Sequence, residues 1–327
     1  MKAVVCGRNF TSRLGMIRAL GESGYEVILV RTNEGHDIDS YSRYVIKDIF
    51  SSERDEGSLM QTLLSLQPES GGKMLLMPVD DYCAAVIDQN LDALKDKYLF
   101  QNINMTQGEV GRLMDKGLQK SLAVKAGMNV ASGRLVKIEN GLYSIPEEVK
   151  YPCFTKPLAS FKDGKAYMRK CSSEKELRTV LDSAASTRKN CDIMVEDFVQ
   201  IEKELAIVGI SDGEKVVIPG VIQMLLDGIM YVEGAATHTG VTCLGKVYPP
   251  ELYKDFLSRI EDMVKAFRFV GLFDVDAYIA DGKLFFNELN LRFGASGYSI
   301  TASGINLPKM LADSLRSGSA LAKSIHF

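Results

Sequence analysis

A short segment near the C-terminal end, residues 273–291, restricts the fold of this chain more than any other. Two apolar stretches, residues 273–279 and 284–291, flank Asp281 and Gly282. An Asp-Gly pair between two alternating apolar stretches is a strong short-range signal for a β-hairpin. We therefore predict two neighbouring antiparallel strands in this part of the chain.

The polar side chains of this hairpin lie on predictable faces. Period-two alternation puts Glu288, Asn290 and Arg292 on one face of the second strand. The turn decides whether Asp274 and Asp276 join them. A two-residue turn pairs even positions with odd ones and sends both aspartates to the opposite face, whereas a three-residue turn pairs even with even. We expect the three-residue turn, because the alternative buries two aspartates within an apolar run.

Oxygen ligands grouped on two rigid strands suit magnesium, which binds a few carboxylates together with phosphate oxygens and waters. The competing interpretation is a solvent-facing strand on which charged and apolar residues alternate. The neighbouring residues argue against a solvated strand, since they include Phe285, Phe286, Leu289 and Leu291. We therefore predict a metal site on this hairpin.

The first hundred residues show a strand–helix–strand pattern. Residues 2–6, 26–30 and 74–77 have the composition of short buried strands, and residues 12–23 have the apolar spacing of a helix. Sheets of this kind bind ligands at the carboxyl ends of their strands. The polar residues expected at that edge are Asn9, Arg13, Asp80 and Asp81. The first loop lacks the GxGxxG spacing of dinucleotide-binding folds, so we expect no dinucleotide.

Composition and charge exclude several classes of protein. The chain has 327 residues and a net charge of −3, which gives no basic surface for nucleic acid or for an anionic membrane. Its longest apolar runs have the length of strands, so we predict no membrane span. The six cysteines form no CxxC pair and several lie in apolar runs, which indicates buried thiols and a cytoplasmic location.

Two segments of the hairpin region together resemble the closing motif of the ATP-grasp superfamily. They are Gly-Leu-Phe-Asp-Val-Asp-Ala-Tyr-Ile, from residue 271, and Asp-Gly-Lys-Leu-Phe-Phe-Asn-Glu-Leu-Asn-Leu-Arg-Phe-Gly-Ala-Ser, from residue 281. In that motif an acidic residue leads through a hairpin to Glu-x-Asn-x-Arg. The resemblance implies that Asp276, Glu288 and Asn290 hold Mg²⁺, with Mn²⁺ as a substitute, and that Arg292 steadies the transferring phosphate. Asp274 is a rival for the first ligand position.

The resemblance also implies a fold and a division into domains. The expected fold class is α/β and α+β, with a Rossmann-like N-terminal domain followed by a two-subdomain ATP-grasp fold. The N-terminal domain would comprise residues 1–105. The first ATP-grasp subdomain, residues 106–192, would contain a linker helix and a small lid, and the second, residues 193–327, would carry the magnesium site.

Three lysines match phosphate-binding landmarks of the superfamily. Lys116 and Lys156 correspond to its two phosphate-binding lysines, and residues 160–164, which include Lys162, resemble the loop that closes over the phosphates. Taken alone, either Lys116 or Lys156 would far more often be an ordinary surface residue. Lys156 is the stronger candidate, because it lies on an apolar strand where a partly buried ammonium needs an anion.

Residues 194–199 resemble the hinge between the two ATP-grasp subdomains. There Glu196 would accept a hydrogen bond from the adenine amino group, and backbone groups of Asp197 and Val199 would contact the purine edge. Glu204 matches the acid that contacts ribose, although it could also be an ordinary strand residue. The predicted ATP-binding set is Lys116, Lys156, Lys162, Glu196, Asp197, Phe198, Val199 and Glu204.

The implied activity is that of an ADP-forming, ATP- and Mg²⁺-dependent carboxylate–amine ligase, with an acyl-phosphate intermediate and amino-acid-like substrates. The candidate substrate residues are Asn9, Arg13, Asp81 and His238; Arg13 suits a carboxylate and Asp81 an amine. The expected partners are small molecules, with a homodimer as a further possibility. Two alternatives stay open: an enzyme of the carbamoyl-phosphate synthetase or carboxylase type that phosphorylates bicarbonate, and a catalytically silent ATP-binding regulatory protein.

Overall fold

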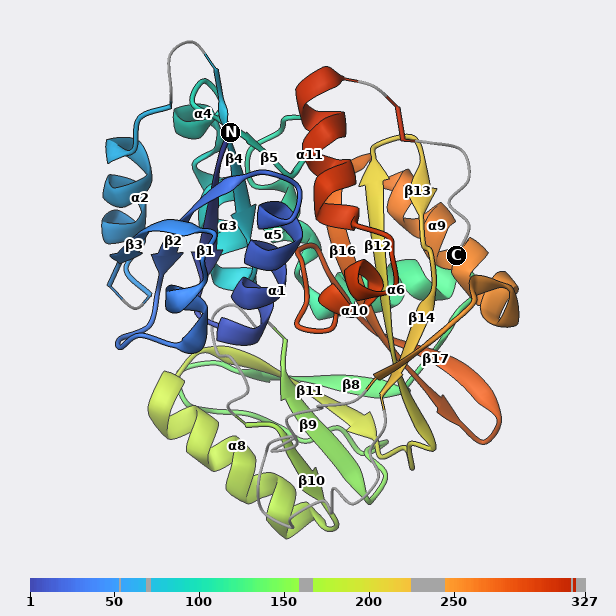
Figure 1. The fold of residues 1–327 in the computed structure, drawn as a ribbon. Helices are drawn as coiled ribbons and strands as arrows, with labels where there is room; N and C mark the ends of the chain where they lie inside the picture. Colours follow the sequence, from blue (N-terminus) through green and yellow to red (C-terminus); the bar gives the residue numbers. More distant parts are fainter. Residues whose placement is uncertain (53, 69–71, 159–166, 225–244, 319, 322–327) are drawn as a thin grey trace.

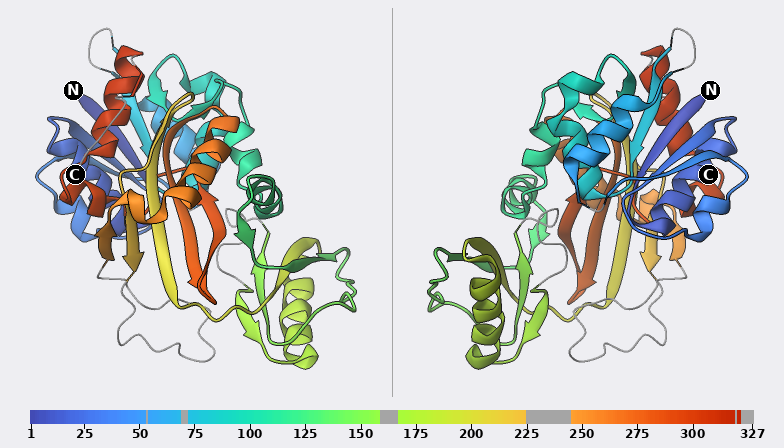
Figure 2. Two further views of the ribbon diagram at one scale, coloured as in Figure 1. Left: turned by 90° about the vertical axis from the view of Figure 1, so that its right-hand side faces the viewer. Right: turned by 90° about the vertical axis from the view of Figure 1, so that its left-hand side faces the viewer.

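The computed structural model describes residues 1–52, 54–68, 72–158, 167–224, 245–318 and 320–321. Three β-sheets organise these residues: a parallel sheet near the N-terminus, a small antiparallel sheet, and a large mixed sheet (Figure 1). The views in Figure 2 show the small sheet and its helix projecting from a body formed by the other two sheets. The predicted α/β and α+β architecture is confirmed.

Five parallel strands form the N-terminal sheet, in the order β3-β2-β1-β4-β5. The central strands are apolar between their ends, as expected for a sheet that helices cover on both faces. Asn9 and Asp80 cap the helices that follow two central strands, each accepting hydrogen bonds from backbone amides of the first turn. The elements are β1 (Lys2–Gly7), α1 (Phe10–Gly21), β2 (Glu26–Arg31), η1 (Ile38–Tyr41), β3 (Val45–Phe50), α2 (Glu56–Ser65), β4 (Met74–Pro78), α3 (Asp81–Gln89), α4 (Leu91–Leu94) and β5 (Tyr98–Phe100).

The small sheet is antiparallel, with strand order β10-β9-β11-β8, and one helix packs on it. Its buried apolar residues all lie between positions 136 and 195, so it has a core of its own. The elements are β8 (Gly133–Ile138), β9 (Cys153–Pro157), β10 (Arg169–Cys171), α8 (Glu174–Arg188) and β11 (Cys191–Asp197).

The large sheet has the order β15-β14-β12-β16-β17-β7, with β13 and β6 added beside β12 and β16. Three helices, α5, α6 and α9, cover one face, while α1 and α11 cover the other and join it to the N-terminal sheet in one apolar core. The elements are β6 (Asn102–Ile103), α5 (Glu109–Leu113), α6 (Lys116–Lys125), β7 (Asn129–Val130), β12 (Lys203–Asp212), β13 (Val216–Val217), β14 (Val221–Met224), β15 (Gly245–Tyr248), η2 (Pro250–Tyr253), α9 (Lys254–Ala266), β16 (Phe269–Ala280), β17 (Lys283–Asn290), α10 (Tyr298–Ala302) and α11 (Leu307–Ser317).

The sheets group the residues differently from the predicted domain limits. The expected division between residues 192 and 193 runs through β11, which pairs with β8 and β9 of the small sheet. Similarly, α5, α6 and β7 fall within the predicted range 106–192, yet they pack on or pair with the large sheet. Within the described ranges no helix has both the length and the apolarity needed to cross a membrane.

The β16–β17 hairpin brings the predicted acidic residues together by a different route from the one expected. Ala280 pairs with Lys283, so the turn contains only Asp281 and Gly282, at φ values of 48° and 65°. The expected three-residue turn is therefore wrong. A register shift between Asp276 and Ala277 leaves one extra residue in β17, and it restores even-to-even pairing beyond that point.

As a result of this bulge, Asp276 lies opposite Glu288 and Asp274 lies opposite Asn290. Opposed residues of paired strands point to the same face of the sheet. The convergence of these four side chains is confirmed, although the predicted reason for it is not.

Gly282→Ala should lower the free energy of unfolding by about 1 kcal/mol, because an L residue resists the left-handed conformation of this turn. A Cβ at Gly282 would have no described neighbour within 4 Å, so the loss comes from the backbone alone. Urea denaturation measures the change. Gly57→Ala in the exposed first turn of α2 is the control and should cause no loss; equal losses in both variants would contradict the turn geometry.

Candidate active site

The site is built on the β16–β17 hairpin, where three carboxylates and an amide lie on one face. Asn290 Nδ2 donates to Asp276 Oδ2 at 3.3 Å, and Arg292 Nη2 donates to Asn290 Oδ1 at 3.1 Å. Burial, together with the neighbouring Asp274 and Glu288, raises the pKa of Asp276 above its ordinary value. Burial also raises the pKa of Asp274. These carboxyl groups lie where a bound cation would stabilise their charged form.

Arg292 connects this hairpin to the N-terminal sheet. Its Nε atom donates to Asp81 Oδ1 at 2.8 Å, across 211 positions of sequence. Burial opposes the charge of the guanidinium, but Asp81, Asp274 and Asp276 outweigh it and raise the pKa of Arg292. Asp81 is the first residue of α3, so the carboxyl edge of the N-terminal sheet forms one wall of the site.

Three lysines lie opposite the hairpin. Lys116 Nζ is 3.0 Å from Glu288 Oε2, and only 8% of the lysine side chain is exposed. Although burial raises the pKa of Glu288, Lys116 and Lys156 contribute to a net lowering. Lys156 Nζ is 2.9 Å from Glu196 Oε1. Lys120 also pairs with Glu196, and burial lowers the pKa of Lys120 despite that partner.

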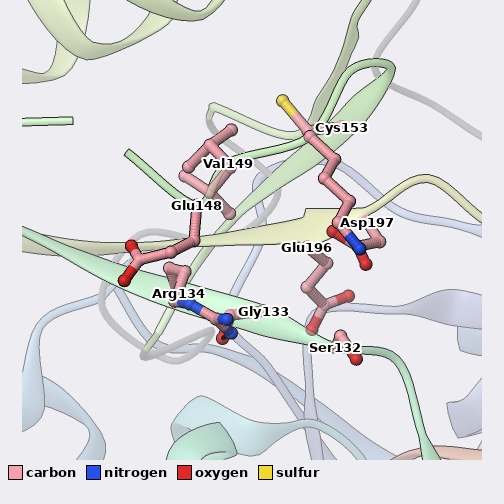
Figure 3. A pocket seen from close by; sticks show the side chains of 10 residues that line it. Ser132, Gly133, Arg134, Glu148, Val149, Cys153, Glu196 and Asp197 are labelled. Atoms are coloured by element: carbon pink, nitrogen blue, oxygen red, sulfur yellow. Dashed lines mark hydrogen bonds between the residues drawn. The ribbon is translucent and has the colours of Figure 1, made fainter. Parts of the chain in front are cut away.

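The hinge lies at the end of β11, beside a small pocket of about 80 Å³ whose lining Figure 3 shows. The lining residues are Ser132, Gly133, Arg134, Glu148, Val149, Lys150, Cys153, Val195, Glu196 and Asp197. The Asp197 amide donates to Ser132 O at 2.8 Å, and the Phe198 amide donates to Pro152 O at 3.1 Å. Two amides of the predicted hinge therefore bind neighbouring backbone, and the Glu196 carboxylate binds lysines. Val199 follows in the same connection, and Glu204 lies on β12.

Some predicted residues lie apart from this group. Arg13 is fully buried and donates to Asp39, Asp37, Asn33 and the Gly7 carbonyl, an arrangement that holds the loop after β2. Asn9 caps α1 and remains exposed at the edge of the N-terminal sheet. Lys162 and His238 lie outside the described residues.

Sequence reasoning missed several residues of the site. Lys120 follows Lys116 by one helical turn, so helical spacing could have placed both on one face of α6. Asn287, the extra residue of the bulge, accepts from Lys156 Nζ at 3.3 Å. Tyr278 and Phe285 stack with ring centroids 5.2 Å apart. Burial, with a contribution from Glu196, raises the pKa of Tyr278 to about 12. Tyr278 lies opposite Glu204 on β12, the strand that follows the hinge.

The donor set fits a magnesium ion that also binds phosphate. Asp274 Oδ1 is buried and has no hydrogen-bond partner among the described residues. No group of three or more His, Cys, Asp or Glu side chains in the described part of the chain is arranged to hold a metal by itself. Two carboxylates and one amide suit Mg²⁺, which takes its remaining ligands from phosphate and water.

A sheet-borne carboxylate site facing buried lysines is an arrangement suited to binding a nucleoside triphosphate with a divalent cation. The family model that describes the ATP-grasp domain matches residues 121–307. That match covers more than half of the chain, and the chain belongs to the ATP-grasp family.

Curated proteins similar in sequence include two carbamoyl phosphate synthase large chains. The one from Halobacterium salinarum is 28% identical over 188 residues, covering 56% of this chain and 17% of the relative. The one from Neisseria meningitidis serogroup B is 25% identical over 316 residues, covering 89% of this chain and 26% of the relative. The chain thus spans about a quarter or less of the length of these relatives.

Solved structures show the same fold at low sequence identity. An L-amino acid ligase from Bacillus licheniformis is 15% identical with a TM-score of 0.68, over 97% of this chain and 75% of that one. The biotin carboxylase domain of 2-oxoglutarate carboxylase from Hydrogenobacter thermophilus, a dimer solved with MgADP, ADP and bicarbonate, is 17% identical with a TM-score of 0.70. It covers 99% of this chain and 71% of that chain.

Gln119→Leu should lower the free energy of unfolding by about 2 kcal/mol, because it leaves buried backbone groups without partners. The Gln119 side chain donates to Leu289 O at 2.7 Å and to Leu113 O at 2.8 Å, and accepts from the Leu289 amide at 2.9 Å. Chemical denaturation measures the loss. Gln61→Leu on the exposed side of α2 is the control, with a change within about 0.5 kcal/mol. A stability loss no larger than the control's would show that Gln119 does not anchor α6 to β17.

Proposed function

We propose that this protein is an ADP-forming carboxylate–amine ligase that uses ATP and Mg²⁺. The observation that carries the proposal is the meeting of Asp276, Glu288, Asn290 and Arg292 on one face of the β16–β17 hairpin, opposite buried lysines. Family membership supports the use of ATP. A protein that had lost catalysis would have no need to keep this set of ligands, which disfavours a purely regulatory role.

The reaction follows from the weakness of a carboxylate as an acylating agent. Transfer of the γ-phosphoryl group of ATP to a carboxylate oxygen gives an acyl phosphate and releases ADP. An amine then attacks the acyl carbon, phosphate leaves, and the amine proton passes to solvent or a nearby base. Such transfers need in-line positioning and charge neutralisation more than covalent help from the protein.

Each cationic side chain would have a separate task in this scheme. Lys116 and Lys156 would bind the ATP phosphates, with Lys162 as a further ligand from its loop. Arg292 would stabilise the charge that develops on the transferred phosphoryl group and the acyl intermediate. Its Nε edge is held by Asp81, which leaves the other edge of the guanidinium directed along the hairpin toward Asn290.

Asp276, Glu288 and Asn290 would hold Mg²⁺, or Mn²⁺ in its place, with Asp274 as the rival for the first position. The unpartnered buried oxygen of Asp274 supports its inclusion. A bound divalent cation would neutralise phosphate charge and orient the phosphates for transfer.

The nucleoside would lie against the hinge. Glu196, Asp197, Phe198 and Val199 would contact the adenine, with Glu204 toward the ribose. The ring of Tyr278, which stacks on Phe285 and lies opposite Glu204, would offer an apolar surface for the purine.

The second substrate would enter beside the N-terminal sheet. Asp81 and Asn9 are placed at its carboxyl edge, and Asp81 would suit an amine. Arg13 is a weaker candidate because its guanidinium is fully buried as well as paired, and His238 remains a proposal from sequence. The similarity in fold to the L-amino acid ligase supports amino-acid-like substrates, and the carboxylase-domain dimer supports a homodimer.

A second candidate activity is the phosphorylation of bicarbonate. The two carbamoyl phosphate synthase large chains favour it, since they are similar to this chain in sequence. In that reaction bicarbonate takes the place of the organic acid as the acceptor of the γ-phosphoryl group. The lysines, Arg292 and the hairpin carboxylates would keep the same tasks.

Glu288→Gln should reduce substrate-dependent ADP release by at least about 100-fold, because it removes a carboxylate from the phosphoryl-transfer site. The assay follows ADP and phosphate separately with Mg²⁺-ATP, pooled amino acids and small carboxylates. Glu251→Gln, at an exposed position in η2, is the control and should keep wild-type turnover.

The same assay separates the candidate activities. ADP release that requires an acid and an amine supports the ligase, whereas ADP release that requires only bicarbonate supports the second candidate. AMP and pyrophosphate as products would contradict the acyl-phosphate route. ATP binding without turnover in any pool would contradict both activities and favour the regulatory alternative.

A further inference from the structure

Three lysines share two carboxylates at the centre of this site. Among the described residues, Lys116 pairs with Glu288, whereas Lys120 and Lys156 both pair with the same oxygen of Glu196. All five side chains are at least four-fifths buried. Two ammonium groups therefore share one carboxylate oxygen in a place shielded from water, and one of them could pair with an incoming anion while the other keeps Glu196 neutralised.

The Lys156 ammonium cannot pair with Glu196 and with a phosphate equally closely. If it turns toward a nucleotide phosphate, its contact with Glu196 weakens, and Lys120 is then the one close cation that the described part of the chain provides for this buried carboxylate. Without Lys120, Glu196 would instead retain Lys156, because a buried carboxylate without a cation is strongly disfavoured. The availability of Lys156 for phosphate thus depends on Lys120.

Lys120 is held in place for this task from two sides. Its Nζ atom donates to Ala131 O at 3.1 Å and to Glu196 on β11 of the small sheet. The helix that carries it is fixed to the large sheet through Gln119, which binds both backbone groups of Leu289 on β17. Lys120 thereby spans the large and small sheets at the hinge.

We propose that Lys120 is a positioning residue that holds the Glu196 carboxylate and so frees Lys156 to bind the nucleotide phosphates. The inference rests on the proposed use of ATP but assigns a residue that the proposed function does not include. Lys120 acts through Glu196 and Lys156 and does not touch the nucleotide itself.

Calorimetry with a non-hydrolysable ATP analogue and Mg²⁺ tests the proposal. Lys120→Met should raise the Kd of the analogue roughly tenfold, since Lys156 then stays on Glu196. Adenosine should bind the variant and the wild type alike, because it has no phosphate for Lys156. Lys125→Met, at an exposed position on the same helix, is the matched control and should leave both affinities unchanged.

Removing the Glu196 carboxylate distinguishes a positioning role of Lys120 from direct contact between Lys120 and the phosphates. In the Glu196→Gln background Lys156 no longer has a carboxylate to neutralise, so Lys120→Met should change the Kd of the analogue by less than about twofold. A loss of the same size in both backgrounds would mean that Lys120 binds phosphate itself and would overturn the proposal. Unchanged affinity in the single variant would overturn it too.

Two further variants cover the case in which Lys120→Met fails to fold: Lys120→Arg, and the double variant that combines Lys120→Met with Glu196→Gln. Lys120→Arg keeps the charge and should bind the analogue within about threefold of wild type, and the double variant contains no buried carboxylate without a cation. Weak binding by a folded Lys120→Arg variant, together with a double variant weaker than Glu196→Gln, would contradict the proposal. A wild-type protein that binds no analogue would refute the proposed use of ATP, and this inference with it.

Discussion

Buried charge is the constraint on which this site depends. A carboxylate placed inside a sheet without a cation takes up a proton, because burial disfavours its charged form. Glu288 avoids this outcome because Lys116, Lys156 and Arg292 together lower its pKa despite its burial. Asp274 and Asp276 lie side by side on one face of β16, and burial raises the pKa values of both despite the nearby Arg292. The same face of the hairpin therefore offers both a charged ligand and groups whose ionisation a cation would favour.

The hairpin shows how far sequence reasoning reaches and where it stops. Period-two alternation placed Glu288 and Asn290 on one face, and an Asp-Gly pair marked the turn, because both features depend on residues close together in sequence. The length of the turn and the bulge at Asn287 could not be predicted in the same way. A bulge depends on the partner strand and, here, on Lys156 of a different sheet, which binds the extra side chain.

For the ion pairs, too, the sequence indicated some of the residues but not their partners. Lys116 and Lys156 were found by resemblance, but their partners lie far away in sequence, at Glu288 and Glu196. Arg13 was expected near a substrate because it follows the first strand. Asp37 and Asp39, from the loop after β2, bind it instead, and nothing in the local sequence connects these residues. Position along the chain predicts which edge of a sheet a residue occupies, while its partner depends on tertiary packing.

Apolar and polar contacts have different tasks in joining the three sheets. One apolar core joins the N-terminal and large sheets, with α1 and α11 between them, which fixes Asp81 against Arg292. The small sheet has a core of its own, and its contacts at the site are polar: Lys156 binds Asn287 of the hairpin, and Glu196 binds Lys120 of α6. Buried ion pairs contribute little net stability compared with apolar packing, but they depend strongly on geometry. A phosphate can replace a carboxylate in such a pair, whereas no ligand replaces a packed core. The polar contacts of the small sheet are therefore the part of this assembly that a nucleotide is able to rearrange.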